Sequence, residues 1–234
     1  MSRRATATTK KSDETRTRIL EAALELFRKR GFGRTTMRDI AQEAEVALGA
    51  AYYYFDSKDA LVMEFYKRAQ RELDPLLEEA LSKHQGLEER LRAAIEVKFQ
   101  YFAANRQLLG ALSAHIDPRH PLSPFSEETR AMRERDIEFL TLALEGAKTG
   151  IPDDIRTQLP RVLWLYQMGL LLFWVYDSSP AQTKTSRLFQ KSLSIVVNLI
   201  KFSRLPLMRH VRKLVTDLFD IVYGEESAIA EVAP

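Results

Sequence analysis

Apolar side chains recur at intervals of three and four residues along most of this chain, and that spacing limits its possible folds more than any other feature. Ile19, Ala23, Leu26 and Phe27 show it at i, i+4, i+7 and i+8, and Gly31 follows as a helix stop signal. Such spacing gathers apolar side chains on one face of an α-helix. No run alternates in the manner of a half-buried strand, so the sequence predicts an all-α protein.

Helices are expected from the N-terminal region to near the end of the chain. After the first helix, two short ones are predicted at residues 37–44 and 47–55, and a fourth takes Ser57 as its N-cap and ends before Pro75. The others are predicted at 87–104, 105–116, 125–148, 155–177, 186–203 and 207–223. The proline-rich loop from Asp117 to Pro124 separates two of them.

Composition excludes several classes of protein. The 234 residues contain no cysteine, which rules out disulfide scaffolds, thiolate metal sites and cysteine nucleophiles, and which fits a reducing cytoplasm. The polar N-terminus lacks the apolar stretch of a secretory signal. No glycine-rich phosphate loop or nucleophile motif appears, so we expect neither an enzyme nor a cofactor. His115 and His120 flank Asp117, and a metal site there is a minor alternative to the expectation of no metal.

Positive charge is concentrated at the N-terminus. Residues 1–58 contain 12 Lys and Arg against 8 Asp and Glu, although the net charge of the whole chain is only +3. Arg3, Arg4, Lys10 and Lys11 all precede the first acid, Asp13. We expect residues 1–12 to form a basic disordered arm, which either lies along a phosphate backbone or is a solvated tail.

The segment from Val162 to Val175 is apolar on almost every side, yet at 14 residues it is too short to span a bilayer comfortably. A helix that is apolar all round must be covered on all sides. A second subunit can cover the face that its own core leaves open, and the helix at 186–203 is its natural neighbour. This predicts a four-helix dimer interface that contains Leu171, Val175, Leu193, Val196, Val197 and Ile200.

Two short helices joined by a tight turn, with Ala41, Val46 and Ala51 at compact spacing, form a helix-turn-helix pattern whose second helix would enter the major groove of DNA. Residues 15–62 as a whole resemble the DNA-binding domain of the tetracycline-repressor (TetR) family. The matching features are "FRKRGF", "TTMRDIA", the valine of the turn, "YYYF" and the "SK" that opens the fourth helix.

The resemblance implies a homodimeric transcriptional regulator, usually a repressor, that a small molecule in the C-terminal domain releases from its operator. Residues 13–60 would be the DNA-binding domain, 61–224 the sensing and dimerisation domain, and 225–234 an acidic tail. One alternative keeps the DNA-binding domain but gates it by a protein partner, or leaves it constitutive. Another is a helical enzyme that binds a metal or a substrate.

Family position also implies which side chains meet DNA. Tyr52 would donate to a phosphate, Tyr53 would reach a phosphate or a thymine methyl group, Phe55 would pack inside, and Tyr54 would do either. In the alternative, all three tyrosines belong to the core. The complete expected set is Thr36, Arg38, Ala47, Leu48, Gly49, Tyr52, Tyr53 and Lys58.

The roles within this set differ. Thr36 caps a helix and can meet a phosphate, whereas Arg38 matches guanine, with a phosphate contact or a surface salt bridge as alternatives. Lys58 suits a phosphate or is a solvated lysine. Ala47 and Leu48 replace the polar pair that is common in the family and offer only apolar contacts. Glu45 occupies a turn position where glycine is common, so a positive φ there would cost about 1 kcal/mol.

Charged residues interrupt two apolar stripes in the C-terminal part. Lys98 falls among Leu91, Ile95 and Phe102, and Asp136 falls among apolar residues of the helix at 125–148. A buried charge must be paired or functional. One hypothesis is a ligand cavity formed by Lys98, Phe99, Phe102, Asp136, Trp164, Gln167 and Met168. In the alternative, the two charges pair with each other or reach outward, and the aromatic rings are simply core.

Overall fold

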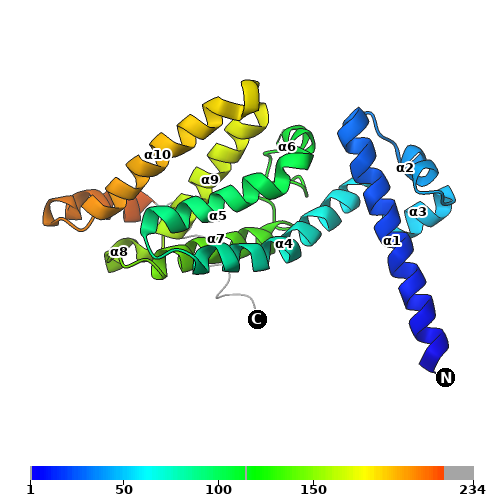
Figure 1. The fold of residues 1–234 in the computed structure, drawn as a ribbon, viewed down its shortest axis with the longest axis horizontal. Coiled ribbons are helices and arrows are strands. Elements are labelled where there is room, and N and C mark those ends of the chain that lie inside the picture. Colours follow the sequence, from blue (N-terminus) through cyan, green and yellow to red (C-terminus); the bar gives the residue numbers. More distant parts are fainter. Residues whose placement is uncertain (1, 114, 219–234) are drawn as a thin grey trace. The chain divides into compact units, whose positions relative to one another are not determined.

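The computed structural model describes residues 2–113 and 115–218, and every regular element in those ranges is a helix, as predicted (Figure 1). The α-helices are α1 (Ser2–Arg30), α2 (Met37–Glu43), α3 (Leu48–Tyr54), α4 (Lys58–Ser82), α5 (Leu87–Phe102), α6 (Arg106–Leu112), α7 (Arg130–Glu145), α8 (Asp153–Arg156), α9 (Leu159–Tyr176) and α10 (Thr183–Phe202). Short 3-10 turns are η1 (Ala103–Asn105), η2 (Pro180–Gln182) and η3 (Pro206–Met208), and residues 209–218 are helical. The expected acidic tail at 225–234 lies outside the described residues.

The chain forms two compact units, and their boundary differs from the predicted one near residue 60. The first unit comprises Met1–Pro75 together with Gln100–Arg133, and the second comprises Leu76–Phe99 together with the chain from Glu134 onward. The helix-turn-helix region therefore shares its unit with most of α4 and with a segment far away in sequence. The reason is a common apolar core.

That core brings together residues from four parts of the first unit. Ile19 and Phe27 of α1 are at most 1% exposed, and Phe65 of α4 is equally buried. Leu108 and Leu122, from α6 and the loop after it, complete the same cluster at 1% exposure each. Burial of this kind stabilises a fold by about 1.5–3 kcal/mol per large apolar side chain, so residues 100–133 are part of the unit's stability.

Helix α1 begins at Ser2, which corrects the prediction that residues 1–12 form a disordered arm. No glycine or proline interrupts the chain between Ser2 and Arg30, which is compatible with one continuous helix over that range. The helix ends as predicted at Gly31, whose φ of 83° is the left-handed conformation that glycine adopts without strain.

Helix α4 continues through Pro75 to Ser82, whereas the sequence had indicated an end before the proline. Proline lacks an N–H and leaves the carbonyl four residues earlier, that of Arg71, without its helical partner. Both residues are exposed on the outer side of α4, where water can bond that carbonyl. The interruption is therefore tolerated.

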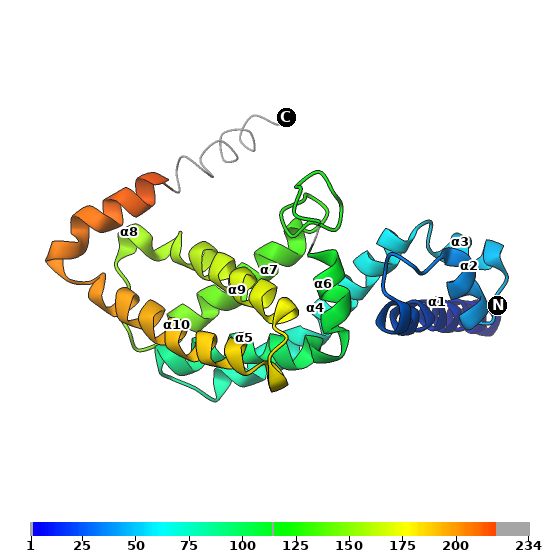
Figure 2. The ribbon, with the colours of Figure 1, turned by 90° about the horizontal axis from the view of Figure 1, so that it is seen from above.

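The second unit is built around α5, α7, α9 and α10, of which α9 and α10 pack side by side (Figures 1 and 2). Phe99 of α5 lies between them, with ring centroids 5.2 Å from Trp174 and 5.9 Å from Phe189. Arg90 donates hydrogen bonds to the carbonyls of Leu81, His84, Leu142 and Ala143. This side chain ties the end of α4 and the end of α7 to α5.

Candidate nucleic-acid interface

Thr36 starts α2 with a reciprocal cap, as the sequence indicated. The Asp39 backbone N–H donates to Thr36 Oγ1 at 3.2 Å, and the Thr36 N–H donates to Asp39 Oδ2 at 2.8 Å. These bonds from Thr36 hold the pKa of Asp39 below its ordinary value. Thr36 is nevertheless exposed, so it lies at the surface with its hydroxyl already engaged.

The turn between α2 and α3 contains a residue in the left-handed conformation. Glu45 has a φ of 53°, so a residue other than glycine adopts here the conformation that glycine favours. The Val46 N–H then donates to the Ala41 carbonyl at 3.0 Å, and Val46 packs against the core of the unit. The turn thus fixes the angle at which α3 leaves α2, while the Glu45 side chain stays exposed.

Helix α3 separates its residues cleanly into an inner and an outer face. Ala51 is fully buried and Phe55, directly after the helix, is 3% exposed, as predicted for Phe55. Tyr52 and Tyr53 are 49% and 83% exposed. The alternative in which all three tyrosines are core is therefore wrong.

The third tyrosine takes an intermediate position. Tyr54 is half-buried, its ring meets that of Tyr53 edge-on at 5.2 Å, and its hydroxyl accepts a hydrogen bond from Ser12 Oγ at 3.3 Å. It links α3 to α1 and supports the more exposed ring beside it.

The rest of the outer surface is formed by small or flexible side chains. Ala47 and Gly49 are exposed and Leu48 is half-buried. Arg38, in the first turn of α2, is exposed and makes no hydrogen bond or ion pair with the described residues, so the surface salt bridge considered for it is not seen. Arg34 is also exposed, and it is a further candidate for the same surface that the sequence analysis did not include. Its position just before the start of α2 is the feature that could have identified it.

Lys58 has partners within its own unit. Its ammonium donates to the Phe32 carbonyl at 2.7 Å and lies 4.4 Å from the centre of the Phe32 ring. It is therefore not the freely solvated lysine of the alternative, because it fastens the loop after α1 to the start of α4. The adjacent Ser57 caps α4 as predicted, accepting from the Ala60 N–H at 3.1 Å.

The residues expected around a ligand have several kinds of partner. Lys98, 4% exposed, pairs with Asp136 at 2.7 Å, so the alternative in which the two charges meet each other is the one observed. Phe99 packs into the core between α9 and α10. Phe102 belongs to the first unit, where its ring centroid lies 6.1 Å from that of Phe65.

Among the residues expected around a ligand, Gln167 has a buried side-chain amide whose nitrogen and oxygen make no hydrogen bond with the described residues. The residue is 1% exposed. Leaving such a group unsatisfied costs about 1–3 kcal/mol. Trp164 is buried on the same helix and Met168 is half-buried, so the surroundings of Gln167 are largely apolar.

The apolar face that α9 and α10 leave exposed differs from the face that the sequence analysis expected at a dimer interface. Leu193, Val197 and Ile200 are buried inside the subunit itself, at 0%, 1% and 4% exposure, so they cannot present a surface to a partner. Leu171, Val175 and Val196 are half-buried. The large apolar side chains left exposed on the two helices are Leu165, Leu172, Phe173 and Tyr176 of α9 and Leu188, Ile195, Leu199 and Phe202 of α10.

Two other kinds of site find no support. The rings of His115 and His120 stack at 3.9 Å, but Asp117 is bound by Arg119, and the described residues contain no group of three or more side chains suited to hold a metal ion. Likewise, no helix in the described ranges is long and apolar enough to cross a membrane.

Sequence comparison agrees with this geometry. Residues 19–65 match the profile described as "Bacterial regulatory proteins, tetR family", and residues 90–218 match "Tetracyclin repressor-like, C-terminal domain". The HTH-type transcriptional regulator TtgR of Pseudomonas putida is 30% identical over 179 residues, which are 72% of this chain and 83% of TtgR. The HTH-type transcriptional repressor KstR2 of Rhodococcus jostii is 28% identical over 140 residues, or 59% of this chain and 66% of KstR2.

Solved structures show the same fold. A TetR-family transcriptional regulator from Streptomyces coelicolor has a TM-score of 0.60 at 20% identity, over 81% of this chain and 97% of that one. FadR from Bacillus subtilis, in complex with stearoyl-CoA, has a TM-score of 0.59 at 18% identity, over 77% and 97% of the two chains. The chain therefore belongs to the TetR family of helix-turn-helix DNA-binding transcriptional regulators, which are not enzymes.

Proposed function

We propose that the protein is a cytoplasmic homodimeric repressor, bound to a palindromic operator and released by a small apolar or amphipathic effector. The observation that carries the DNA-binding role is the outer face of α3, where Tyr52 and Tyr53 are exposed beside Ala47 and Gly49. Large aromatic side chains that are exposed on a short helix do not contribute their apolar surface to the core. Contact with phosphates and thymine methyl groups would explain why two of them lie on this face.

The proposed dimer is supported by the apolar side chains that α9 and α10 leave uncovered. Ile195, Leu199 and Phe202 are each more than half exposed, at i, i+4 and i+7 of α10. A stable interface buries about 800 Å² of surface per partner, and a stripe of this length on two neighbouring helices suits a four-helix arrangement. The dimer would hold its two α3 helices about one DNA turn apart, roughly 34–36 Å or a multiple of it.

The effector site is supported by Gln167. Its amide needs a donor and an acceptor that the described residues do not supply, and a bound molecule with both would satisfy it. Because Asp136 neutralises Lys98, the proposed effector needs no charge to match that lysine. The complex of B. subtilis FadR with stearoyl-CoA is a precedent in this fold for a bound amphipathic molecule with a long acyl chain.

One observation favours the alternative, a regulator gated by a protein partner or a constitutive one. The Lys98–Asp136 pair and the packing of Phe99 against Trp174 and Phe189 are what a filled core without an effector would also show. The two functions differ in their response to small molecules.

The test is selection of bound sites from random DNA duplexes, repeated with a metabolite library. A palindromic site that is lost on adding one compound supports the ligand-released repressor. A palindromic site that no compound disturbs favours the alternative, and the absence of any enriched site contradicts sequence-specific binding.

A further inference from the structure

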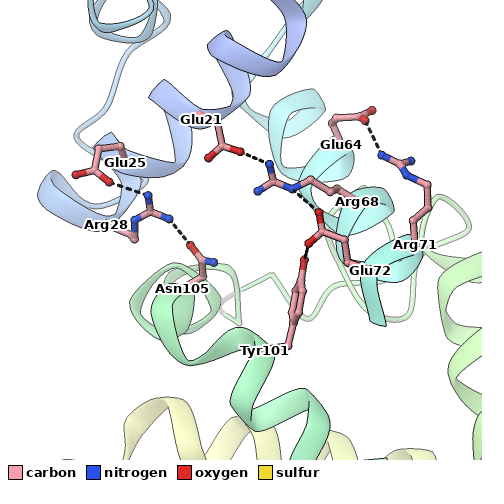
Figure 3. A network of polar contacts seen from close by, with 9 residues as sticks. All are labelled: Glu21, Glu25, Arg28, Glu64, Arg68, Arg71, Glu72, Tyr101 and Asn105. Atoms are coloured by element: carbon pink, nitrogen blue, oxygen red, sulfur yellow. Dashed lines mark hydrogen bonds and ion pairs between the residues drawn. The ribbon is translucent and has the colours of Figure 1, made fainter. Parts of the chain in front are cut away.

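A polar network in the first unit joins α1 and α4 to a third element, the segment 101–105, which comprises the end of α5 and η1 (Figure 3). On α1, Glu21, Glu25 and Arg28 stand at i, i+4 and i+7, so they share one face. On α4, Glu64, Arg68 and Glu72 are likewise four residues apart. Arg68 pairs with Glu21 across the two helices and lies 3.8 Å from Glu72.

The third element supplies two partners from residues that are distant in sequence. The Tyr101 hydroxyl, at the end of α5, donates to Glu72 Oε2 at 2.5 Å. Asn105 of η1, 8% exposed, accepts from Arg28 Nη1 at 3.1 Å. Burial and the neighbouring Glu72 carboxylate raise the pKa of Tyr101, so the hydroxyl keeps its proton and remains the donor at neutral pH.

The network contributes more to register than to stability. Exposed ion pairs add little free energy one by one, and Glu21 and Glu72 are each about half exposed. The hydrophobic effect, in contrast, is not directional, so apolar burial alone does not assign each polar group its partner. Hydrogen bonds with defined partners select one rotation, and Tyr101 and Asn105 make them from a segment that is itself anchored in the core by Leu108 and Leu122.

We propose that Tyr101 and Asn105 are positioning residues for operator binding, holding α1 and α4 in the one register that presents α3 at the correct separation in the dimer. The proposal rests on the proposed function, because it needs a palindromic operator. Neither residue lies on α2 or α3, so neither is expected to touch DNA. Their effect would be on the spacing of half-sites that the protein accepts.

The experiment compares Tyr101→Phe, Asn105→Ala and the double variant with the wild type on three duplexes. These are the selected palindrome and two derivatives with one base pair inserted or removed at its centre. The matched control is Tyr166→Phe, which also removes one hydroxyl, bonded at 2.7 Å to Ser192, but in the second unit. Tyr101→Phe deletes only the hydroxyl group. If the double variant does not fold, the comparison on the three duplexes can still be made with this single variant.

We expect the double variant to bind the palindrome on the order of 3- to 10-fold more weakly, as the loss of two hydrogen bonds implies. It should also discriminate less between the palindrome and the altered duplexes, whereas the control keeps the discrimination of the wild type. A general loss of folding would lower the affinity for all three duplexes alike, so it would leave unchanged the ratio of the affinity for the palindrome to that for the altered duplexes. An unchanged ratio in Tyr101→Phe and the double variant would overturn the proposal, and a wild type without any palindromic site would overturn the proposed function itself.

Discussion

Gly49 lies on the exposed side of α3, and a methyl group added at its Cα would meet no atom within 4 Å. Nothing in the described fold therefore requires a glycine at this helical position. Glycine inside a helix costs about 0.5–1 kcal/mol relative to alanine. The missing side chain would benefit a partner that approaches the helix closely, which in the proposed function is DNA.

Gly49→Ala should consequently raise the free energy of unfolding by about 0.5–1 kcal/mol while it weakens operator binding several-fold. Denaturant unfolding and a fluorescence anisotropy titration with the selected duplex measure the two effects. A variant that gains stability and keeps full affinity would show that α3 does not approach the DNA closely at this point.

Individual side chains also show where sequence reasoning reaches its limit. The inward direction of Phe55 was predictable, because it follows from the position of this residue in the motif that resembles the TetR family. The partner of Lys58 was not, since the Phe32 carbonyl is 26 residues away and its position depends on the path of the loop after α1.

The turn between α9 and α10 contains an unusual concentration of strain. Ala181 and Gln182 have φ values of 50° and 51°, a conformation that side chains other than glycine rarely adopt. Asp177 holds the turn by accepting from the Ser179 N–H at 2.9 Å and from the Thr185 N–H and hydroxyl at 2.8 and 2.7 Å. Burial opposes the charge of this carboxylate, but these hydrogen bonds outweigh it and hold the pKa of Asp177 well below its ordinary value.

A lowered pKa in the folded state means that the carboxylate stabilises the protein above the ordinary pKa of aspartate, about 3.9. That contribution is lost as the pH falls through the lower, folded-state value. Asp177→Asn should therefore lower the melting temperature at pH 7, and the difference from the wild type should shrink toward pH 3. Thermal scans at several pH values test this, and a constant difference would mean that the charge of Asp177 is not what holds the turn.

The faces of α10 show why three of the residues expected at a dimer interface are buried within the subunit instead. Leu193 and Val197 on one side and Ile195 and Leu199 on the other are all apolar at helical spacing, so the pattern alone does not say which stripe faces the subunit's own core. The structure buries the first pair and exposes the second. Similarly, α4 continues through Pro75 because the proline is exposed and water can bond the carbonyl that it leaves without a partner. Whether a residue is exposed depends on the tertiary fold, so the sequence alone did not show it.

For the subunit as a whole, the exposed stripe predicts the assembly. Ile195→Glu places a charge at a residue that is 60% exposed, in the middle of the α10 stripe, and should convert the dimer into monomers with little loss of folding. Gln190→Glu adds the same charge at an exposed position on another side of α10 and should leave the dimer intact. Analytical ultracentrifugation distinguishes them, and a dimeric Ile195→Glu variant would place the interface elsewhere.

The division into units was the part of the architecture that the sequence predicted least well. The helix-turn-helix motif is recognisable because its residues are contiguous, but its core also takes Leu108 and Leu122 from a segment some 50 residues farther along than the predicted boundary. Leu108 and Leu122 meet the helix-turn-helix residues only in the folded chain, so the sequence does not show this contact. The exposure of Tyr52 and Tyr53 agrees with the outward direction that the family resemblance implies, whereas the Lys98–Asp136 pair depends on a contact between distant helices that the sequence does not show.

DNA recognition by the outer face of α3 is tested most directly at Tyr53, which is 83% exposed. The measurement is the operator affinity of Tyr53→Ala against the wild type, with melting temperature and dimerisation recorded in parallel. We expect unchanged folding and assembly and an affinity at least 5-fold lower, from the loss of contacts worth about 1–3 kcal/mol per site. A variant that folds, dimerises and binds the operator as tightly as the wild type would contradict recognition through this face.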